Sequence, residues 1–288
     1  MQKPLKILVV RFSSIGDIVL TTPVVRLLKK QINAEVHFLT FSRYKSILVN
    51  NPYIDNLHLI DKNIEEVLSQ LKKEKYDLLI DLHHNIRTQL LKQKLGIPSK
   101  SFRKLNVQKW LITTFKINLL PKIHIVDRYL ETIKHLGITN DNLGLDFFLT
   151  DKDKIENLPT DYVAFAIGGK EDFEAAEKIV AATSNTQNAC GKYRIGQSAF
   201  IIKNAKYVIT HDTGMMHIAA AFKKKIYSVW GNTIPAFGMT PYLADASSKI
   251  IEVKNLSCRP CTKIGFGKCP KVHFDCMQKI DENLFLSE

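Results

Sequence analysis

Short apolar runs alternate with amphipathic stretches along the first 150 residues. The apolar runs are rich in Leu, Ile and Val, and they predict strands at Leu5–Val10, Glu35–Thr40, Asn56–Ile60 and Asp77–Leu82. The stretches between them repeat apolar residues with a helical period and predict helices at Pro23–Ile32, Tyr44–Val49, Ile64–Glu74 and Ile86–Leu95. Alternating strands and helices, with several strands apolar on both faces, are typical of a parallel sheet covered by helices.

The pattern repeats after a polar interval. A helix is predicted over residues 125–137, with Gly137 as its C-cap, and a polar stretch with the composition of an interdomain linker follows. We therefore place a domain boundary near Thr150. Beyond it, strands are expected at residues 162–167, 207–210, 225–230 and 249–253, with helices at Glu171–Ala182 and Gly214–Phe222. The sequence predicts an α/β protein with two doubly wound domains, residues 1–150 and 151–288.

One junction in the second series is unusually short. The segment "VAFAIGGKEDFEAAEKIV" begins at Val163 and passes from an apolar strand through two glycines directly into an acidic helix. A strand, a turn and a helix in this order are sterically allowed. The segment is therefore either one ordinary loop or two similar loops joined where a unit has been lost.

Composition excludes several classes of protein. A chain of 288 residues with 45% hydrophobic residues can build packed cores, which argues against a disordered protein. No apolar run approaches the ~20 residues that span a membrane, and the run at Leu5–Val10 is too short for a signal peptide. Five cysteines without an export signal indicate reduced thiols. We expect a cytoplasmic protein.

Positive charge is concentrated in the first half of the chain. Residues 1–150 contain 23 Lys/Arg and 13 Asp/Glu, a difference of +10, whereas residues 151–288 contain 18 and 15, a difference of +3. Between Asp81 and Asp127 there is no carboxylate but nine Lys/Arg, with aromatic residues interleaved. This basic stretch is consistent with a solvated face, an anionic membrane surface, a phosphorylated acceptor or nucleic acid, and charge alone does not decide between them.

The first strand ends in the turn "RFSSIGDIVLTTP". Ser13, Ser14 and Gly16 allow the backbone to turn tightly against a ligand, and Asp17 follows at the carboxyl edge of the predicted sheet. Ligands of doubly wound folds bind at that edge. The alternative is that Asp17 only caps a helix N-terminus. The turn matches neither a G-x-G-x-x-G loop nor a P-loop, so it gives no support for a generic nucleotide motif.

A second turn of this kind lies in the second domain, in "YVITHDTGMMHIAAAF". The strand passes through Asp212, Thr213 and Gly214 into an Ala-rich helix, with His217 near the first helical turn. Backbone amides at that helix start, together with the Thr213 hydroxyl, would suit a diphosphate. The alternative is a helix simply capped by Asp212. The loop "SVWGNTIPAFGMTPY", after the next strand, offers a second site near a phosphate.

Three motifs in this order and spacing resemble the lipopolysaccharide heptosyltransferases of glycosyltransferase family nine. They are "SSIGDIVLTTPVVRLLKK", "HDTGMMHIAAAF" and "WGNTIPAFGMTPY", and the resemblance extends over nearly the whole chain. It implies two Rossmann-like domains in the GT-B arrangement, an N-terminal acceptor domain and a C-terminal donor domain. It also implies inverting transfer of a heptose from ADP-heptose to a lipopolysaccharide core, without a metal ion or other cofactor.

The resemblance also assigns roles to residues. Asp17 corresponds to the proposed general base, which would take the proton of the acceptor hydroxyl. Small or basic residues of the first domain are assigned to the acceptor: Ser13, Ser14, Gly16, Arg87, Lys100, Arg103 and Lys104. Residues of the second domain are assigned to the donor: Glu171, Lys192, Asp212, Thr213, Gly214, His217, Gly231 and Thr233. The expected partners are the nucleotide-sugar donor and the core acceptor at the inner membrane surface, where the enzyme would be peripheral, and not nucleic acid.

The chain departs from the family at the short junction. Family members have a loop with a phosphate-binding lysine, a helix and a second strand between the two Gly-Gly stretches, a unit of about 25–30 residues. The C-terminal domain is thus expected to be shortened, and Lys170 or Lys192 would have to replace the missing lysine. The alternatives are a natural variant with a short domain, and a decayed, non-catalytic paralogue that binds an anionic lipid or glycan acceptor but not the donor.

Four cysteines near the C-terminus have a spacing that could hold zinc. Cys258, Cys261, Cys269 and Cys276 form the pattern C-x2-C-x7-C-x6-C, with His273 nearby. A close first pair followed by two later thiols could bind Zn²⁺ tetrahedrally. The second pair is spaced more widely than in an ordinary zinc ribbon, and the family resemblance explains the pattern without a metal. A structural zinc site and a metal-free loop both remain open.

Overall fold

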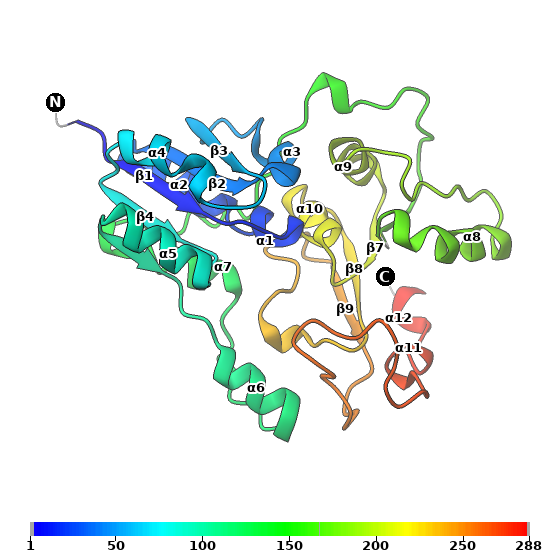
Figure 1. The fold of residues 1–288 in the computed structure, drawn as a ribbon. Helices are drawn as coiled ribbons and strands as arrows, with labels where there is room; N and C mark the ends of the chain where they lie inside the picture. Colours follow the sequence, from blue (N-terminus) through cyan, green and yellow to red (C-terminus); the bar gives the residue numbers. More distant parts are fainter. Residues whose placement is uncertain (1–2, 167, 287–288) are drawn as a thin grey trace. The chain divides into compact units, whose positions relative to one another are not determined.

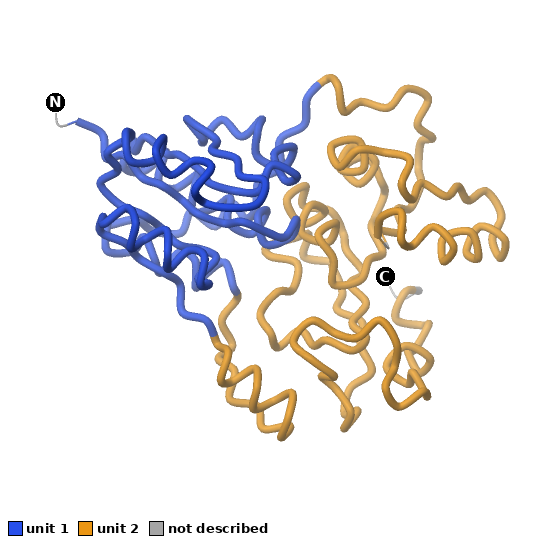
Figure 2. Tube along the Cα trace, in the orientation of Figure 1, with its two compact units in different colours: residues 1–104, 125–150 blue, residues 105–124, 151–288 orange. Residues whose placement is uncertain are grey.

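The computed structural model describes residues 3–166 and 168–286 and divides the chain into two compact units (Figure 2). Unit 1 comprises residues 1–104 and 125–150, and unit 2 comprises residues 105–124 and 151–288. The N-terminal domain expected from the sequence included residues 105–124, which the structure assigns instead to unit 2. Lys116 explains part of this difference, because its ammonium group donates a 2.8 Å hydrogen bond to the carbonyl of Pro260.

Unit 1 is built on a parallel sheet in the order β3-β2-β1-β4-β5 (Figure 1). Its strands are β1 (Lys6–Val10), β2 (Glu35–Phe41), β3 (Asn56–Ile60), β4 (Leu78–Asp81) and β5 (Ser99–Ser101). Its helices are α1 (Ile15–Val19), α2 (Thr22–Ile32), α3 (Lys45–Leu48), α4 (Glu65–Lys73), α5 (Ile86–Leu95) and α7 (Ile125–Leu130). The four predicted strands and four predicted helices of residues 1–95 are confirmed within one or two residues.

Helices cover both faces of this sheet. Successive side chains of a strand point to opposite faces, and residues 7–10 of β1 are all fully buried. On one face, Leu8 and Leu39 pack with Leu71 of α4 and Leu91 of α5. Helices α2 and α7 pack against each other. The arrangement is the doubly wound fold that the alternating pattern predicts, with the carboxyl ends of the strands at one edge.

The end of unit 1 is held by a buried arginine. Arg26 on α2 is 1% exposed and forms ion pairs with Asp141, at 2.8 Å, and with Asp146, and it donates a 2.9 Å hydrogen bond to the carbonyl of Gly144. The polar stretch after Gly137, expected to be a linker, is therefore anchored to unit 1 as far as Thr150. The helix predicted over 125–137 is α7, then a turn and a short 3-10 segment, and it ends at Gly137 in the left-handed conformation expected of a C-cap.

Unit 2 has a parallel sheet of four strands, one fewer than unit 1. Its order is β6-β7-β8-β9, with β6 (Ala164–Ala166), β7 (Val208–His211), β8 (Ile226–Trp230) and β9 (Lys249–Glu252). The helices are α6 (Asn106–Phe115), α8 (Phe173–Ala182), α9 (Ile195–Asn204), α10 (Gly214–Ala221), α11 (Asp275–Gln278) and α12 (Asn283–Leu286). A 3-10 turn over Lys170–Asp172 leads from the β6 region into α8. The strand therefore connects to the acidic helix without an intervening strand and helix, as the shortened domain predicts.

The outer edge of β6 is poorly covered. Phe165 on this strand is 51% exposed, and Ala176 is the buried residue of α8. A cavity of about 600 Å³ lies beside the strand, lined by residues that include Tyr162, Phe165, Ile179 and Ile201. In unit 1, by contrast, the corresponding sheet is buried on both faces. The cavity is bounded by β6, by α8 and by α9.

No helix in the described part of the chain is long and apolar enough to cross a membrane.

Candidate functional site

Asp17 lies in the first turn of α1, the short helix that follows the carboxyl end of β1. Ser14 precedes α1, and its backbone N–H and hydroxyl donate hydrogen bonds of 3.2 and 2.8 Å to Oδ2 of Asp17. The other oxygen, Oδ1, lies 2.7 Å from Nη2 of Arg11. The Asp17 side chain is 22% exposed. The carboxylate is therefore held in one orientation and remains accessible, which a general base requires. Its capping contacts also exist, so the two interpretations of Asp17 are compatible.

Arg11 organises this edge of unit 1. Its buried guanidinium donates hydrogen bonds to the carbonyls of Ser13 and Leu82, each 2.6 Å long, and to the Tyr129 hydroxyl at 3.1 Å. These bonds connect the turn after β1 to the turn after β4 and to α7. Because the guanidinium is fixed from three sides, it fixes the Asp17 carboxylate in turn. Arg11 was not among the predicted site residues, although its position directly after a buried strand is a usable signal.

His83 and Arg128 bring further polar groups to this edge. Burial, and secondarily the charge of Arg11, lowers the pKa of His83 to about 4, so the imidazole is neutral at neutral pH. Within the described residues, Nδ1 of His83 and both Nε and Nη2 of Arg128 are buried without a hydrogen-bond partner. Such groups are expected to find partners, and a bound ligand can supply them. His83 could have been found from its place after β4, whereas Arg128 lies in a helix whose packing the sequence does not reveal.

The predicted acceptor residues fall into two groups. The guanidinium of Arg87 lies over the rings of Phe12 and Phe41, at 5.5 and 5.0 Å from their centres, and the charge of Lys104 acts on His83. These two belong to the same edge as Asp17. Lys100 on β5 and Arg103 just after it are exposed and are directed to solvent. The structure thus brings Ser13, Ser14, Gly16, Arg87 and Lys104 together with Asp17 and leaves Lys100 and Arg103 on an outer surface.

The predicted donor turn lies at the carboxyl end of β7 in unit 2. Thr213 is the N-cap of α10, and its hydroxyl lies 3.3 Å from the Thr210 hydroxyl, so it is not engaged in capping the helix. Asp212 accepts a 3.3 Å hydrogen bond from the Thr233 hydroxyl, which connects this turn to the loop after β8. His217 is buried on the first turns of α10. Asp212, Thr213, Gly214, His217 and Thr233 are thereby brought together.

The loop after β8 is braced by Arg259. Nη2 of this buried arginine donates to the carbonyls of Trp230, at 3.1 Å, and Thr233, at 2.8 Å, and it lies 3.0 Å from a Glu252 oxygen. Gly231 lies within this braced loop, and a β-carbon there would come within 2.9 Å of the Met277 sulfur. The sequence analysis did not single out Arg259. Its position two residues before Cys261 links the cysteine segment to the donor loop.

Glu171 and Lys192 lie on segments that flank α8. Glu171 is exposed in the 3-10 turn before this helix, and Lys192 is exposed in the loop between α8 and α9. That loop approaches the first segment closely, since a β-carbon on Gly191 would lie 2.5 Å from Cγ of Lys170. Lys170 and Lys192 therefore belong to adjoining segments. Their role at the donor remains a prediction.

The four cysteines of the C-terminal segment are neighbours in unit 2. All four are free thiols. Burial raises the pKa of Cys261, and the charges of Cys258 and Cys269 raise it further; burial likewise raises the pKa of Cys276. In the described part of the chain, they do not form a group of three ligand atoms within 4.8 Å of one another. Zinc at this segment stays a prediction.

Comparisons with known proteins show that the chain is similar to heptosyltransferases. Residues 160–267 match the model of glycosyltransferase family 9 (heptosyltransferase). The chain is 21% identical to lipopolysaccharide heptosyltransferase 1 of Campylobacter coli, over 80% of this chain and 84% of that protein. It is 25% identical to lipopolysaccharide heptosyltransferase 3 of Escherichia coli K12, over 77% and 81%. The structure of E. coli ADP-heptose LPS heptosyltransferase II superposes with a TM-score of 0.69 at 18% identity, covering 96% of this chain and 98% of that one.

The fold is that of the GT-B proteins, with two Rossmann-like units. In sequence the chain is similar to the heptosyltransferases of glycosyltransferase family 9, whose model matches residues 160–267.

The alignments also show that the relatives contain residues without a counterpart here. The match to the Campylobacter coli protein extends over 289 positions, but 80% of 288 residues is only about 230. About 59 positions (289 − 230) therefore face gaps in this chain.

Proposed function

We propose that this protein transfers a heptose from ADP-heptose to a lipopolysaccharide core acceptor, with inversion and without a metal ion. The observation that carries the proposal is the Asp17 carboxylate, oriented by Arg11 and Ser14 at the carboxyl edge of its sheet. The Thr213 turn, at the carboxyl edge of the second sheet, complements it. The similarity to the heptosyltransferases of glycosyltransferase family 9 supports the reaction type.

In this reaction Asp17 accepts the proton of the acceptor hydroxyl while that oxygen bonds to the anomeric carbon. The bond from the anomeric carbon to the diphosphate oxygen breaks on the opposite face of the sugar, and ADP leaves. Backbone amides at the start of α10 and the Thr213 hydroxyl stabilise the charge that develops on the diphosphate. His83 and Arg128 suit the polar and anionic groups of the acceptor, because their buried nitrogens have donor or acceptor capacity to spare.

The basic stretch suits the anionic acceptor and the membrane that carries it. Lys100 and Arg103 are exposed, and the aromatic side chains of Trp110 and Phe115 are half exposed on α6. Exposed cations followed in the sequence by exposed aromatics favour an anionic lipid surface. We accordingly propose a cytoplasmic enzyme that is peripheral at the inner membrane.

Reversal of charge in this stretch tests the membrane role. Replacing Lys100, Arg103 and Lys104 together with Glu should weaken binding to vesicles containing anionic lipid by at least about tenfold at low salt, since each basic residue near such a surface contributes ~1 kcal/mol. The loss should shrink as salt rises. The matched control replaces the exposed Lys72, Lys73 and Lys75 with Glu, which changes the net charge equally. If the triple variant and the control bind the vesicles equally in a sedimentation assay, the basic stretch is only a solvated face and does not bind the membrane.

A second candidate function is a non-catalytic paralogue that binds the acceptor but not the donor. The short sheet of unit 2, with Phe165 exposed at its edge, favours this alternative. Calorimetric titration of the chain with ADP separates the two. Saturable binding that is lost in Thr213→Val, with the hydroxyl removed and the shape kept, supports the transferase. If the chain is a non-catalytic paralogue, neither the wild type nor Thr213→Val should give binding heat with ADP. Both proteins should still bind core oligosaccharide.

A further inference from the structure

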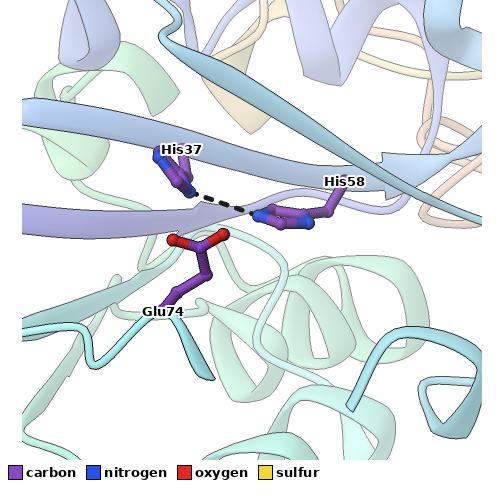
Figure 3. A group of neighbouring side chains, drawn as sticks. All are labelled: His37, His58 and Glu74. Atoms are coloured by element: carbon purple, nitrogen blue, oxygen red, sulfur yellow. Dashed lines mark hydrogen bonds between the residues drawn. The ribbon is translucent and has the colours of Figure 1, made fainter. Parts of the chain in front are cut away.

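Two buried histidines lie side by side in unit 1, on the opposite part of the sheet from Asp17. His37 is the third residue of β2, and His58 lies on the neighbouring strand β3, where it pairs with Leu39. Tyr76 and Glu74 come from the segment that leads into β4. Figure 3 shows the Glu74 carboxylate directed at the two imidazoles. Asp17, by contrast, follows the carboxyl end of β1, so this cluster is separate from the transfer chemistry.

The atoms of the cluster have the spacing of metal ligands. Nδ1 of His37 lies 3.2 Å from Nε2 of His58, and the Tyr76 hydroxyl lies 2.8 Å from each of these nitrogens. Ligands on a tetrahedral Zn²⁺ with bonds near 2.0 Å are about 3.3 Å apart. A carboxylate oxygen of Glu74 lies within 4.8 Å of one ring nitrogen of each histidine. Among the described residues, no other group of three His, Cys, Asp or Glu side chains has its ligand atoms within 4.8 Å of one another.

A second carboxylate fixes the orientation of one imidazole. Oε1 of Glu35 lies 3.1 Å from Nε2 of His37, so that nitrogen carries the proton and donates it to Glu35. The lone pair of Nδ1 then points into the cluster. A carboxylate behind a histidine is the arrangement that orients metal-binding imidazoles and increases their basicity.

The local charge allows a cation. The Lys6 ammonium pairs with Glu35, at 3.0 Å, and with Glu74, so one positive charge faces two negative ones. With both histidines neutral, these groups sum to one negative charge, which a divalent ion would more than balance. Glu74 is the movable member, because its side chain is 23% exposed whereas that of His37 is 4% exposed. It can turn from Lys6 to an ion without disturbing the sheet.

We propose that Nδ1 of His37, Nε2 of His58 and the Glu74 carboxylate bind a divalent transition-metal ion of the zinc class, with the Tyr76 hydroxyl beside it. Two imidazoles and one carboxylate suit Zn²⁺ and Co²⁺ better than Mg²⁺ or Ca²⁺, which take oxygen ligands. The site joins β2, β3 and the segment before β4, so the bound ion stabilises unit 1. It takes no part in sugar transfer.

Cobalt titration of the purified full-length chain, after treatment with a chelator, tests this site. The wild type should bind one more equivalent of Co²⁺ than His58→Gln or Glu74→Gln, with the visible absorption of tetrahedral nitrogen and oxygen coordination and without thiolate charge transfer. The difference between proteins cancels any binding at the cysteine segment. His135→Gln, which removes an exposed histidine of the same unit, is the matched control and should bind as the wild type does.

Thermal melting gives an independent readout. Zn²⁺ should raise the melting temperature of the wild type and of His135→Gln, and should not raise that of Glu74→Gln, whose substitution keeps the shape at the exposed side of the cluster. Equal metal content in the wild type and the cluster variants, with no zinc-dependent shift in melting, would overturn the proposal. The cluster would then be a closed hydrogen-bonded group around Tyr76.

Discussion

Asp17→Asn should lower the rate of sugar transfer by about 10²–10⁴-fold, the typical contribution of a positioned general base. The asparagine oxygen can still accept the hydrogen bond from Arg11, so the turn keeps its shape, but the amide cannot take the acceptor proton. ADP affinity, measured by calorimetry, and the melting temperature should stay close to wild type. The rate is measured as acceptor-dependent release of ADP from ADP-heptose.

The exposed Asp61 offers a matched control. Asp61→Asn makes the same chemical change away from the carboxyl-edge turn and should transfer at the wild-type rate. If Asp17→Asn transfers the sugar at the wild-type rate, Asp17 is not the general base and only caps α1.

Restoring a family-like helix and strand between Gly169 and Lys170 should stabilise the protein and strengthen ADP binding. The added unit would pair with the open edge of β6 and fill the cavity beside Phe165. Burying one such aromatic side chain contributes about 1.5–3 kcal/mol, which corresponds to several degrees in melting temperature. The unit would also supply the phosphate-binding lysine, so we expect at least about tenfold tighter ADP binding, or ~1.4 kcal/mol.

The control for this experiment is a Gly/Ser insertion of equal length at the same position, which adds chain but no packing surface. It should melt no higher than the chain as it stands. If the family-like insertion gains nothing over the Gly/Ser insertion in melting temperature or ADP affinity, the segment at Gly169 is an ordinary loop of a compact donor domain.

The regular elements of the fold could be predicted where the apolar pattern was strong. β1 is an apolar run after Lys6, β2 is mostly apolar, and both are buried on both faces, so their bounds follow closely from the sequence. The same pattern did not predict β5, because Ser99–Ser101 is polar and pairs only at the sheet edge. Nor did it predict α9, whose helical residues follow a polar loop without a strong start signal.

The candidate site could be predicted in part. Asp17 and the Thr213 turn follow strands, and the carboxyl ends of parallel strands are where such folds place their ligands. Arg11, His83 and Arg128 were missed, since their importance comes from contacts between distant segments. Arg11, for example, bonds residues 71 and 118 positions away along the chain. The assignment of residues 105–124 to unit 2 was missed for the same reason, because Lys116 meets its partners only in the folded chain.

The central claim is that this shortened chain still transfers a sugar from ADP-heptose. It is tested most directly by incubating the purified protein with ADP-heptose and a lipopolysaccharide core acceptor and examining the acceptor by mass spectrometry. The account predicts an acceptor heavier by one heptose, formed by the wild type and not by Asp17→Asn. An unchanged acceptor, with a wild-type protein that is folded and binds the core oligosaccharide, would contradict it.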